Sequence, residues 1–307
     1  MNLKNDSTVK LLLLIFGVSA LITLAIWFFS RPEATQERNE ETANLSFKNI
    51  NGTAIDKITL EHSSVSLTFN RQADGWKVNN LAASEEIETF LENLSGSFIG
   101  STASENESSF AGLGVDEEQG YLLKLYQGEN GIFSALIGNQ ATSYKSFYAR
   151  KPEDKNVYLV YGEIRPYVTR SLDQWRNKTI LSVDEESVGS LSYLIGNQSF
   201  SIEKEGESWK LVRGSQRSDV NQTLLERVWL ALNPLTATSF AEDGQSFNFE
   251  SATNTLTLNL TDQSTLEIKE VVNGENHFFQ KTGESTVYLI SELTSQEIFV
   301  NPEELKQ

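Results

Sequence analysis

Apolar and polar residues alternate along much of the chain beyond residue 46, a pattern typical of half-buried strands with one polar face. The clearest alternation runs over residues 58–60, 65–69, 123–125 and 256–260. Turn-forming residues separate these segments, at 74–75, 127–131 and 273–274. The pattern predicts antiparallel sheets built from short strands.

Helical spacing interrupts the strands twice. The first helix has its apolar residues at Ile87, Phe90, Leu91 and Leu94, and the second at Leu224, Leu225 and Val228. Ser84 is the expected N-cap of the first helix, and Ser218 or Asp219 that of the second. Together with the strands, these helices predict an α+β fold.

The segment from Leu11 to Phe29 differs, since its nineteen residues carry no charge. At about 1.5 Å per residue such a helix spans about 28 Å, close to the ~30 Å hydrocarbon core of a bilayer. A cleaved signal peptide is the alternative, but its apolar region is usually about 7–15 residues long. Here the segment ends in Trp27 and two phenylalanines, which suit a membrane interface. We therefore expect an uncleaved single-pass transmembrane helix at residues 11–29.

The basic residues around this segment set its expected orientation. Two lysines and the α-amine precede it, and two arginines follow it, so the bias is slight. By the positive-inside rule, residues 1–10 form a cytoplasmic tail. The remainder then lies in the periplasm, anchored in the inner membrane of a Gram-negative bacterium. Residues 30–45 are polar without periodicity, which predicts a tether.

The soluble portion repeats itself. Residues 76–78 (WKV) recur at 209–211 (WKL), 133 residues later, and residues 157–160 (VYLV) recur at 287–290 (VYLI), 130 residues later. Each half has the same order of hairpin, helix, two strand pairs and a short helical stretch. We therefore expect two tandem repeats of a β-rich unit, over residues 46–180 and 181–307, each an antiparallel sheet with one or two short helices.

Four segments stand out in order along the chain, at residues 75–77 (GWK), 87–94, 110–113 (FAGL) and 175–181 (WRNKTIL), and the opening is repeated at 209–211 and 220–232. Together these segments resemble the DUF4340 family, a domain of unknown function in bacterial envelope proteins. The likeness covers roughly residues 55–300, although residues 114–116 (GVD) replace the usual proline after the Gly-Leu segment. It implies a single-pass envelope protein, related to auxiliary components of gliding-motility ABC transporters. It carries no known catalytic residues.

Charge and cysteine usage exclude several classes of protein. The net charge is −17, and so acidic a surface repels phosphate backbones and anionic lipid headgroups, which argues against nucleic-acid binding. Without cysteine the chain has no disulfide, thiolate metal site, cysteine nucleophile or lipoprotein anchor. The expected contact with the bilayer is therefore the helix at residues 11–29.

Signatures of catalysis and of bound cofactors are missing from the sequence. The two histidines, His62 and His277, accompany no nucleophile elbow, so both are expected to be ordinary strand or surface residues. The acidic runs at 116–118 and 184–186 lack the alternation and glycine of a calcium loop, which predicts solvated loops. We expect no metal, no cofactor and no enzymatic activity.

Three tryptophans and one arginine are the candidate structural or interface residues. Trp76 and Trp209 occupy equivalent places in the two repeats, which favours a shared core role over stacking on a ligand. Trp175 and Arg176 lie at the predicted junction of the repeats. We hypothesise that Arg176 pairs with a carboxylate there and fixes the angle between the halves.

These expectations support three functional hypotheses. The leading one is a non-enzymatic accessory or scaffold protein that docks on an ABC-type transporter or another envelope complex. The second is a module that binds a periplasmic ligand in a cleft between the repeats. The third is an envelope hydrolase with a convergent Ser-His site or paired carboxylates.

Overall fold

The computed structural model describes residues 16, 43–242 and 244–307 of the chain. They divide into two compact units, one ending at Arg176 and the other running from Asn177 to Gln307. Apart from Phe16, the predicted anchor lies outside the described residues, as do the predicted cytoplasmic tail and most of the tether. Within the ranges that are described, no helix is both long and apolar enough to cross a membrane.

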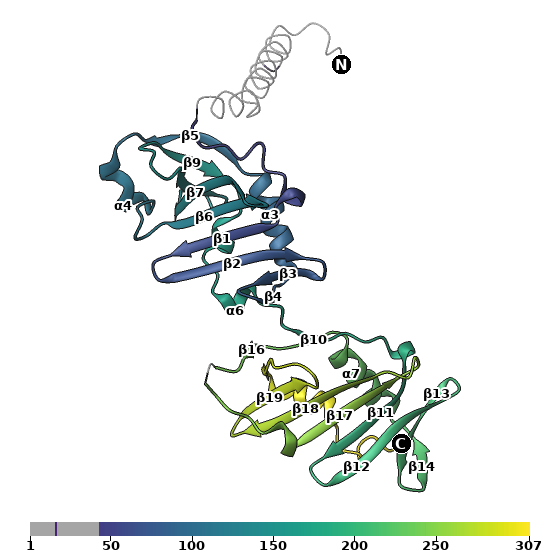
Figure 1. Cartoon of the computed structure of the whole chain (residues 1–307). Coiled ribbons are helices and arrows are strands. Elements are labelled where there is room, and N and C mark those ends of the chain that lie inside the picture. Colours follow the sequence, from purple (N-terminus) through teal and green to yellow (C-terminus); the bar gives the residue numbers. More distant parts are fainter. Residues whose placement is uncertain (1–15, 17–42, 243) are drawn as a thin grey trace, which may run out of the picture. The chain divides into compact units, whose positions relative to one another are not determined.

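Unit 1 is a nine-stranded antiparallel sheet with short helices (Figure 1). Its strands are β1 (Lys57–His62), β2 (Val65–Gln72), β3 (Gly75–Val78), β4 (Leu81–Ala82), β5 (Phe98–Ser104), β6 (Tyr121–Gln127), β7 (Asn130–Gln140), β8 (Ser146–Arg150) and β9 (Val157–Tyr161). Its helices are η1 (Gly52–Ala54), α3 (Glu86–Ser95), η2 (Glu107–Ser109), α4 (Phe110–Leu113), α5 (Arg165–Val168) and α6 (Leu172–Trp175). The strand order is β4-β3-β2-β1-β6-β7-β8-β9-β5.

Unit 2 contains a second nine-stranded antiparallel sheet and a separate pair, β10–β15. Its strands are β10 (Thr179–Leu181), β11 (Val188–Ile195), β12 (Gln198–Glu205), β13 (Ser208–Arg213), β14 (Gln216–Asp219), β15 (Leu235–Thr236), β16 (Ser239–Phe240), β17 (Asn254–Leu260), β18 (Thr265–Asn273), β19 (Asn276–Lys281) and β20 (Tyr288–Ile290). Its helices are η3 (Glu185–Ser187), α7 (Gln222–Leu232), η4 (Phe249–Ser251) and α8 (Glu292–Ile298). The large sheet has the order β14-β13-β12-β11-β17-β18-β19-β20-β16, which matches unit 1 strand for strand.

The expected α+β class is confirmed, with two large antiparallel sheets. The predicted helix face is buried in α3. The predicted cap of α3 is wrong by one residue, because Glu85 is the N-cap and has no side-chain capping bond, while Ser84 just before it accepts a hydrogen bond from the Glu86 amide. The predicted cap of α7 is wrong. Ser218 and Asp219 continue β14 by pairing with β13, and Asn221 caps the helix by accepting a bond from the Leu224 amide.

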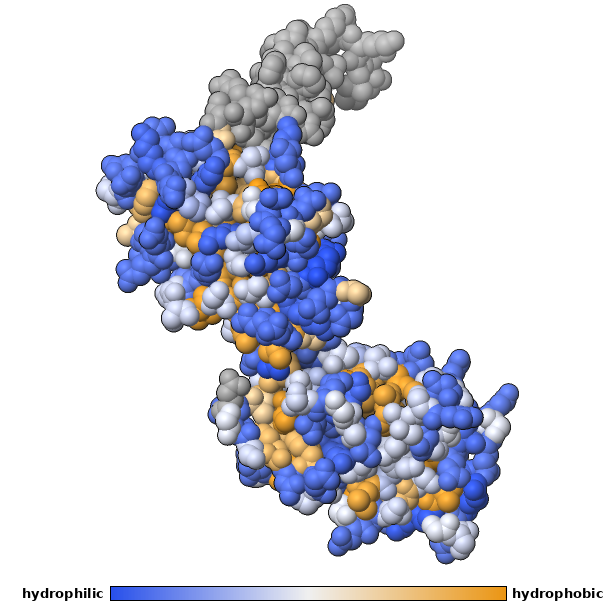
Figure 2. Space-filling model, viewed as in Figure 1, coloured by the Kyte–Doolittle hydropathy of each residue, from blue (hydrophilic) through white to orange (hydrophobic). Residues whose placement is uncertain are grey.

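Each unit has its own hydrophobic core, formed between the helices and the apolar face of its sheet. In unit 1 this core includes Leu45 and Phe47, which precede the first strand and are 2% and 0% exposed. Figure 2 shows that most of the visible surface of each unit is hydrophilic. The chain therefore becomes part of a folded core as early as Leu45.

Candidate functional site

The tryptophans at the start of each repeated motif lie in the two cores. Trp76 and Trp209 are 6% and 4% exposed. The Trp76 indole donates to Glu88 of α3 (2.8 Å), whereas the Trp209 indole donates to Glu185 of η3 (2.7 Å). A buried indole N–H costs free energy when it has no acceptor, and the two units supply that acceptor from different elements. Both tryptophans are therefore packed within the core of their own unit.

Trp175 is fully buried in unit 1. Its ring meets Phe69 and Phe90 edge-on, with centroids 5.0 and 5.8 Å apart, and so joins α6 to the sheet and to α3. Arg176, the last residue of the unit, forms an ion pair with Asp173 three residues earlier (3.3 Å). This local pair lies within unit 1.

The two histidines have different surroundings. His62 stacks on Tyr121, with ring centroids 4.0 Å apart. His277 lies 2.7 Å from a carboxylate oxygen of Glu270, which is fully buried. The same oxygen accepts a bond from Ser295 (2.5 Å), and the other oxygen accepts one from Asn254 (2.5 Å). This polar cluster links β17, β18, β19 and α8.

The geometry of the polar cluster does not match a catalytic triad. In a triad the histidine lies between the serine and the acid, so that it can remove the serine proton. Here Glu270 lies in the middle, and both Ser295 and His277 contact its Oε1. The arrangement satisfies a buried carboxylate with donors and ties α8 onto the sheet.

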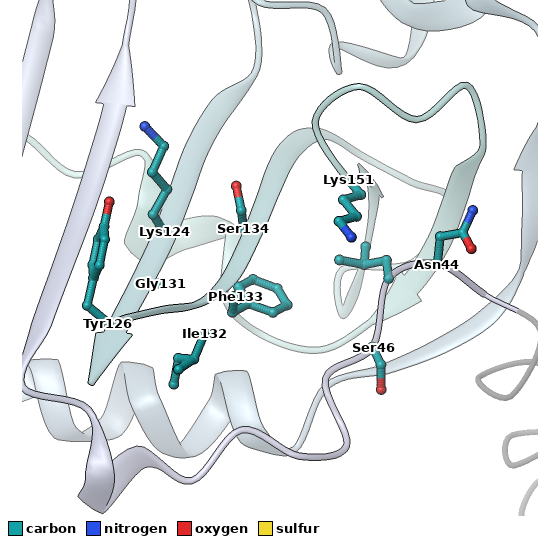
Figure 3. Close-up of a pocket in the computed structure, with 10 residues that line it drawn as sticks. Asn44, Ser46, Lys124, Tyr126, Gly131, Ile132, Phe133, Ser134 and Lys151 are labelled. Atoms are coloured by element: carbon teal, nitrogen blue, oxygen red, sulfur yellow. The ribbon is translucent and has the colours of Figure 1, made fainter. Parts of the chain in front are cut away.

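A surface pocket of about 350 Å³ lies in unit 1 and was not predicted from the sequence (Figure 3). Its charged and polar lining comes from Lys124, Lys151, Tyr126, Ser134, Ser46 and Asn44, and its apolar lining from Leu45, Ile132 and Phe133, with Gly131. This volume lies within the range of about 300–1,000 Å³ usual for small-molecule sites. The lining residues include two lysines and no acidic residue.

A β-bulge shapes the pocket. Tyr126 pairs with Gly131 and Leu125 pairs with Phe133, so Ile132 has no partner on β6. Bulges bend a strand and redirect a side chain, and they are frequent beside functional sites. Ile132 is accordingly 45% exposed at the pocket. Gly131 followed by two apolar residues was the sign of this irregularity in the sequence.

The two lysines reach the pocket from different elements. Lys124 lies on β6 beside Tyr126 and Ser134, and forms an ion pair with Glu61 of β1 (3.2 Å). Lys151 follows β8 and approaches from a separate loop (Figure 3). The Lys151 side chain makes no ion pair or hydrogen bond with a described residue.

Arg150 anchors the loop that carries Lys151. Its guanidinium is buried and donates to the Val115 carbonyl (2.6 Å) and to the Lys151 and Asp154 carbonyls (3.4 Å each). Burial lowers the pKa of Arg150 from its ordinary value. Because backbone carbonyls satisfy this cation, it holds the loop in place next to the pocket.

The corresponding region of unit 2 has a different chemistry. The register of the two sheets places Thr257 where unit 1 has Lys124, and Glu267 where unit 1 has Ser134. The Thr257 hydroxyl donates to Glu267 (3.3 Å). Residues 254–259 pair with residues 265–270 without a bulge. The basic, bulged arrangement therefore belongs to unit 1.

The acidic runs form local turns. In the first, Asp116 accepts hydrogen bonds from the Glu118 and Gln119 amides (3.0 and 2.7 Å). In the second, Asp184 precedes η3. Across residues 43–242 and 244–307 no group of three or more His, Asp or Glu side chains is placed to hold a metal ion.

Comparison with known proteins yields one match. The family described as domain of unknown function (DUF4340) matches residues 76–246, which is more than half of the chain. No curated protein and no solved structure matches.

Proposed function

We propose that this chain, which belongs to the DUF4340 family, is a membrane-anchored accessory or scaffold subunit of an ABC-type transporter or another envelope complex. In this proposal the helix at residues 11–29 holds both units at the periplasmic side of a bacterial inner membrane. The protein recruits or positions other subunits and performs no chemistry itself.

The main support for the proposal is the short segment between the predicted anchor and the first core residues of unit 1. Leu45 and Phe47 are core residues, so only about fifteen residues separate unit 1 from the end of the predicted anchor. A flexible segment of that length has a root-mean-square span of about 20 Å. Unit 1 would then stay close to the bilayer, within reach of an integral membrane partner.

The two sheets support a scaffold rather than an enzyme. Their identical strand order, together with the recurring WK segments, leads us to infer that they are two copies of one unit. Each copy presents a large antiparallel sheet. The buried polar cluster around Glu270 has its acid in the middle, which suits a structural tie better than nucleophilic catalysis.

Affinity purification of the tagged full chain from native membranes, after mild cross-linking, tests the proposal. We expect an integral transporter subunit in the eluate. A matched variant with a long Gly/Ser-rich insertion after Thr42 should recover less of it, because a longer tether lowers the effective concentration of the partner. Recovery of the chain alone would contradict the proposal.

The lack of cysteine makes the orientation directly testable. Ser215→Cys places one thiol in an exposed turn, and Ser7→Cys places one before the anchor. We expect a membrane-impermeant maleimide to label the first in intact spheroplasts and the second only after lysis. The reverse pattern would place both units in the cytoplasm.

A further inference from the structure

The basic pocket of unit 1 has the composition of a site for an organic anion. Lys124 and Lys151 supply two ammonium groups, and Ser134 and Tyr126 supply hydroxyl donors. Ile132 adds an exposed apolar surface to the lining. Charge-assisted hydrogen bonds to an oxyanion are about twice as strong as neutral ones, so the anionic group belongs with the lysines.

The acidic character of the whole chain does not prevent such binding. Exposed charges farther away than the Debye length, about 8 Å at physiological ionic strength, are largely screened. Near the pocket, Glu61 offsets part of the charge of Lys124 (3.2 Å). The Asp154 carboxylate accepts a hydrogen bond from the Asn44 side-chain amide (2.8 Å) and keeps its negative charge. Lys151 makes no ion pair with a described residue and stays available to an incoming anion.

The position of the pocket near the predicted tether narrows the class of anion that it is expected to bind. Asn44, Leu45 and Ser46 line the pocket and are among the first residues described after the predicted tether. We infer that the pocket binds the phosphate of an anionic phospholipid at Lys124 and Lys151, with the adjoining hydrocarbon against Ile132. The choice of a lipid rests on the membrane placement in the proposed function, whereas the anion chemistry rests on the pocket alone.

Unit 2 provides an internal control. Phe279 of unit 2 and Ala149 of unit 1 occupy matching places in the two sheets. Two residues further along each chain segment lie Lys281 and Lys151, so Lys281 corresponds to Lys151. Lys281 pairs instead with Glu284 (2.7 Å). Removing this lysine changes the net charge as much as removing Lys151, but leaves the pocket intact.

The test uses the full chain in neutral detergent micelles, with bound ligand counted by native mass spectrometry. The probes are dihexanoyl phosphatidylglycerol, dihexanoyl phosphatidylcholine and inorganic phosphate. We expect phosphatidylglycerol to bind at least about tenfold more tightly than the other two. Lys124→Ala and Lys151→Ala should each weaken its binding about tenfold, whereas Lys281→Ala should not change it.

Three results would overturn the inference. These are equal binding of phosphatidylcholine, inorganic phosphate binding as tightly as phosphatidylglycerol, and equal losses for Lys281→Ala and Lys151→Ala. Lys124→Arg and Lys151→Arg, which keep the charge, should retain most of the binding and so separate the loss of the site from misfolding. Lipid binding without a recovered partner would contradict only the proposed scaffold role, and partner recovery without lipid binding only this inference.

Discussion

Ile137 of β7 and Glu270 of β18 occupy the same place in the two sheets. Ile137 pairs with Tyr121 of β6, and Glu270 pairs with Asn254 of β17, at matching positions of the two registers. Both side chains are completely buried. Unit 2 therefore holds a carboxylate where unit 1 holds a hydrocarbon, and the donors around Glu270 make this possible.

Glu270→Ala should destabilise unit 2 by about 3 kcal/mol. The substitution leaves three polar side chains, those of Asn254, His277 and Ser295, without their acceptor, and it opens a cavity. Urea unfolding of the full chain in detergent, with hydrogen exchange of unit 2 peptides, measures the loss. Glu275→Ala, on the exposed turn of the same hairpin, should stay within about 0.5 kcal/mol. Equal effects of both substitutions would show that the cluster contributes nothing to stability.

Trp175→Phe should destabilise unit 1 far less than Trp175→Ala. Its indole N–H is buried without a hydrogen-bond partner in the described part of the chain, so Phe removes an uncompensated donor. Phe also keeps the contacts to Phe69 and Phe90, and the expected loss is below about 1.5 kcal/mol. Ala forfeits the buried ring and should cost about 3–5 kcal/mol.

Thermal and urea unfolding of the two Trp175 variants, followed by hydrogen exchange of α3 and α6, distinguish the outcomes. If Trp175→Ala unfolded like the unsubstituted chain, the core role of this residue in unit 1 would be wrong.

Periodicity indicated much of each sheet, because the alternation of side chains is a local property. The same alternation indicates that Glu270 is buried, because Glu270 lies two residues after Ile268 and so falls on the same inner face of β18. The edge strands β5 and β16 were missed. Residues 98–104 (FIGSTAS) show no alternation, and they join the sheet only through long-range pairing with β9.

The pocket depends on contacts that sequence patterns do not encode. Lys124, Lys151 and Asn44 are far apart in the chain, and the fold brings them to one place. A lysine on a polar strand face looks the same in sequence whether it meets solvent or lines a site. The bulge at Ile132 was the local sign, and its meaning depends on the neighbouring segment at residues 44–46.

Tyr193→Phe should stabilise unit 2 by about 1 kcal/mol at neutral pH. The Tyr193 hydroxyl is buried without a partner in the described part of the chain, while its ring stacks on Phe200 with centroids 4.8 Å apart. Phe keeps the ring contact and removes the cost of the unpaired hydroxyl. Tyr144→Phe, at a residue that is 69% exposed, serves as the control and should have no effect.

The substitution Tyr193→Phe should also change how far the free energy of unfolding falls at alkaline pH. Burial raises the pKa of Tyr193 in the folded state, whereas an unfolded tyrosine has a pKa of about 10. The folded state therefore favours the neutral phenol. This contribution is fully present below about pH 10 and is lost as the pH rises further. Urea unfolding at neutral and strongly alkaline pH should show a smaller alkaline loss for Tyr193→Phe, and an unchanged loss would contradict the assignment.

Deleting Ile132 should remove the pocket while keeping the sheet. The deletion joins Gly131 directly to Phe133, so that β7 can pair with β6 without interruption, as β18 pairs with β17. The strand would then lose the bend and the exposed apolar side chain that the bulge provides. We expect binding of dihexanoyl phosphatidylglycerol to the full chain to fall about tenfold, with hydrogen exchange of β6 and β7 still slow. Ile132→Val retains the bulge and an apolar side chain, and it should bind almost as well as the unsubstituted chain. Undiminished binding by the deletion variant would separate the lipid site from the bulge and leave Lys124 and Lys151 to account for it alone.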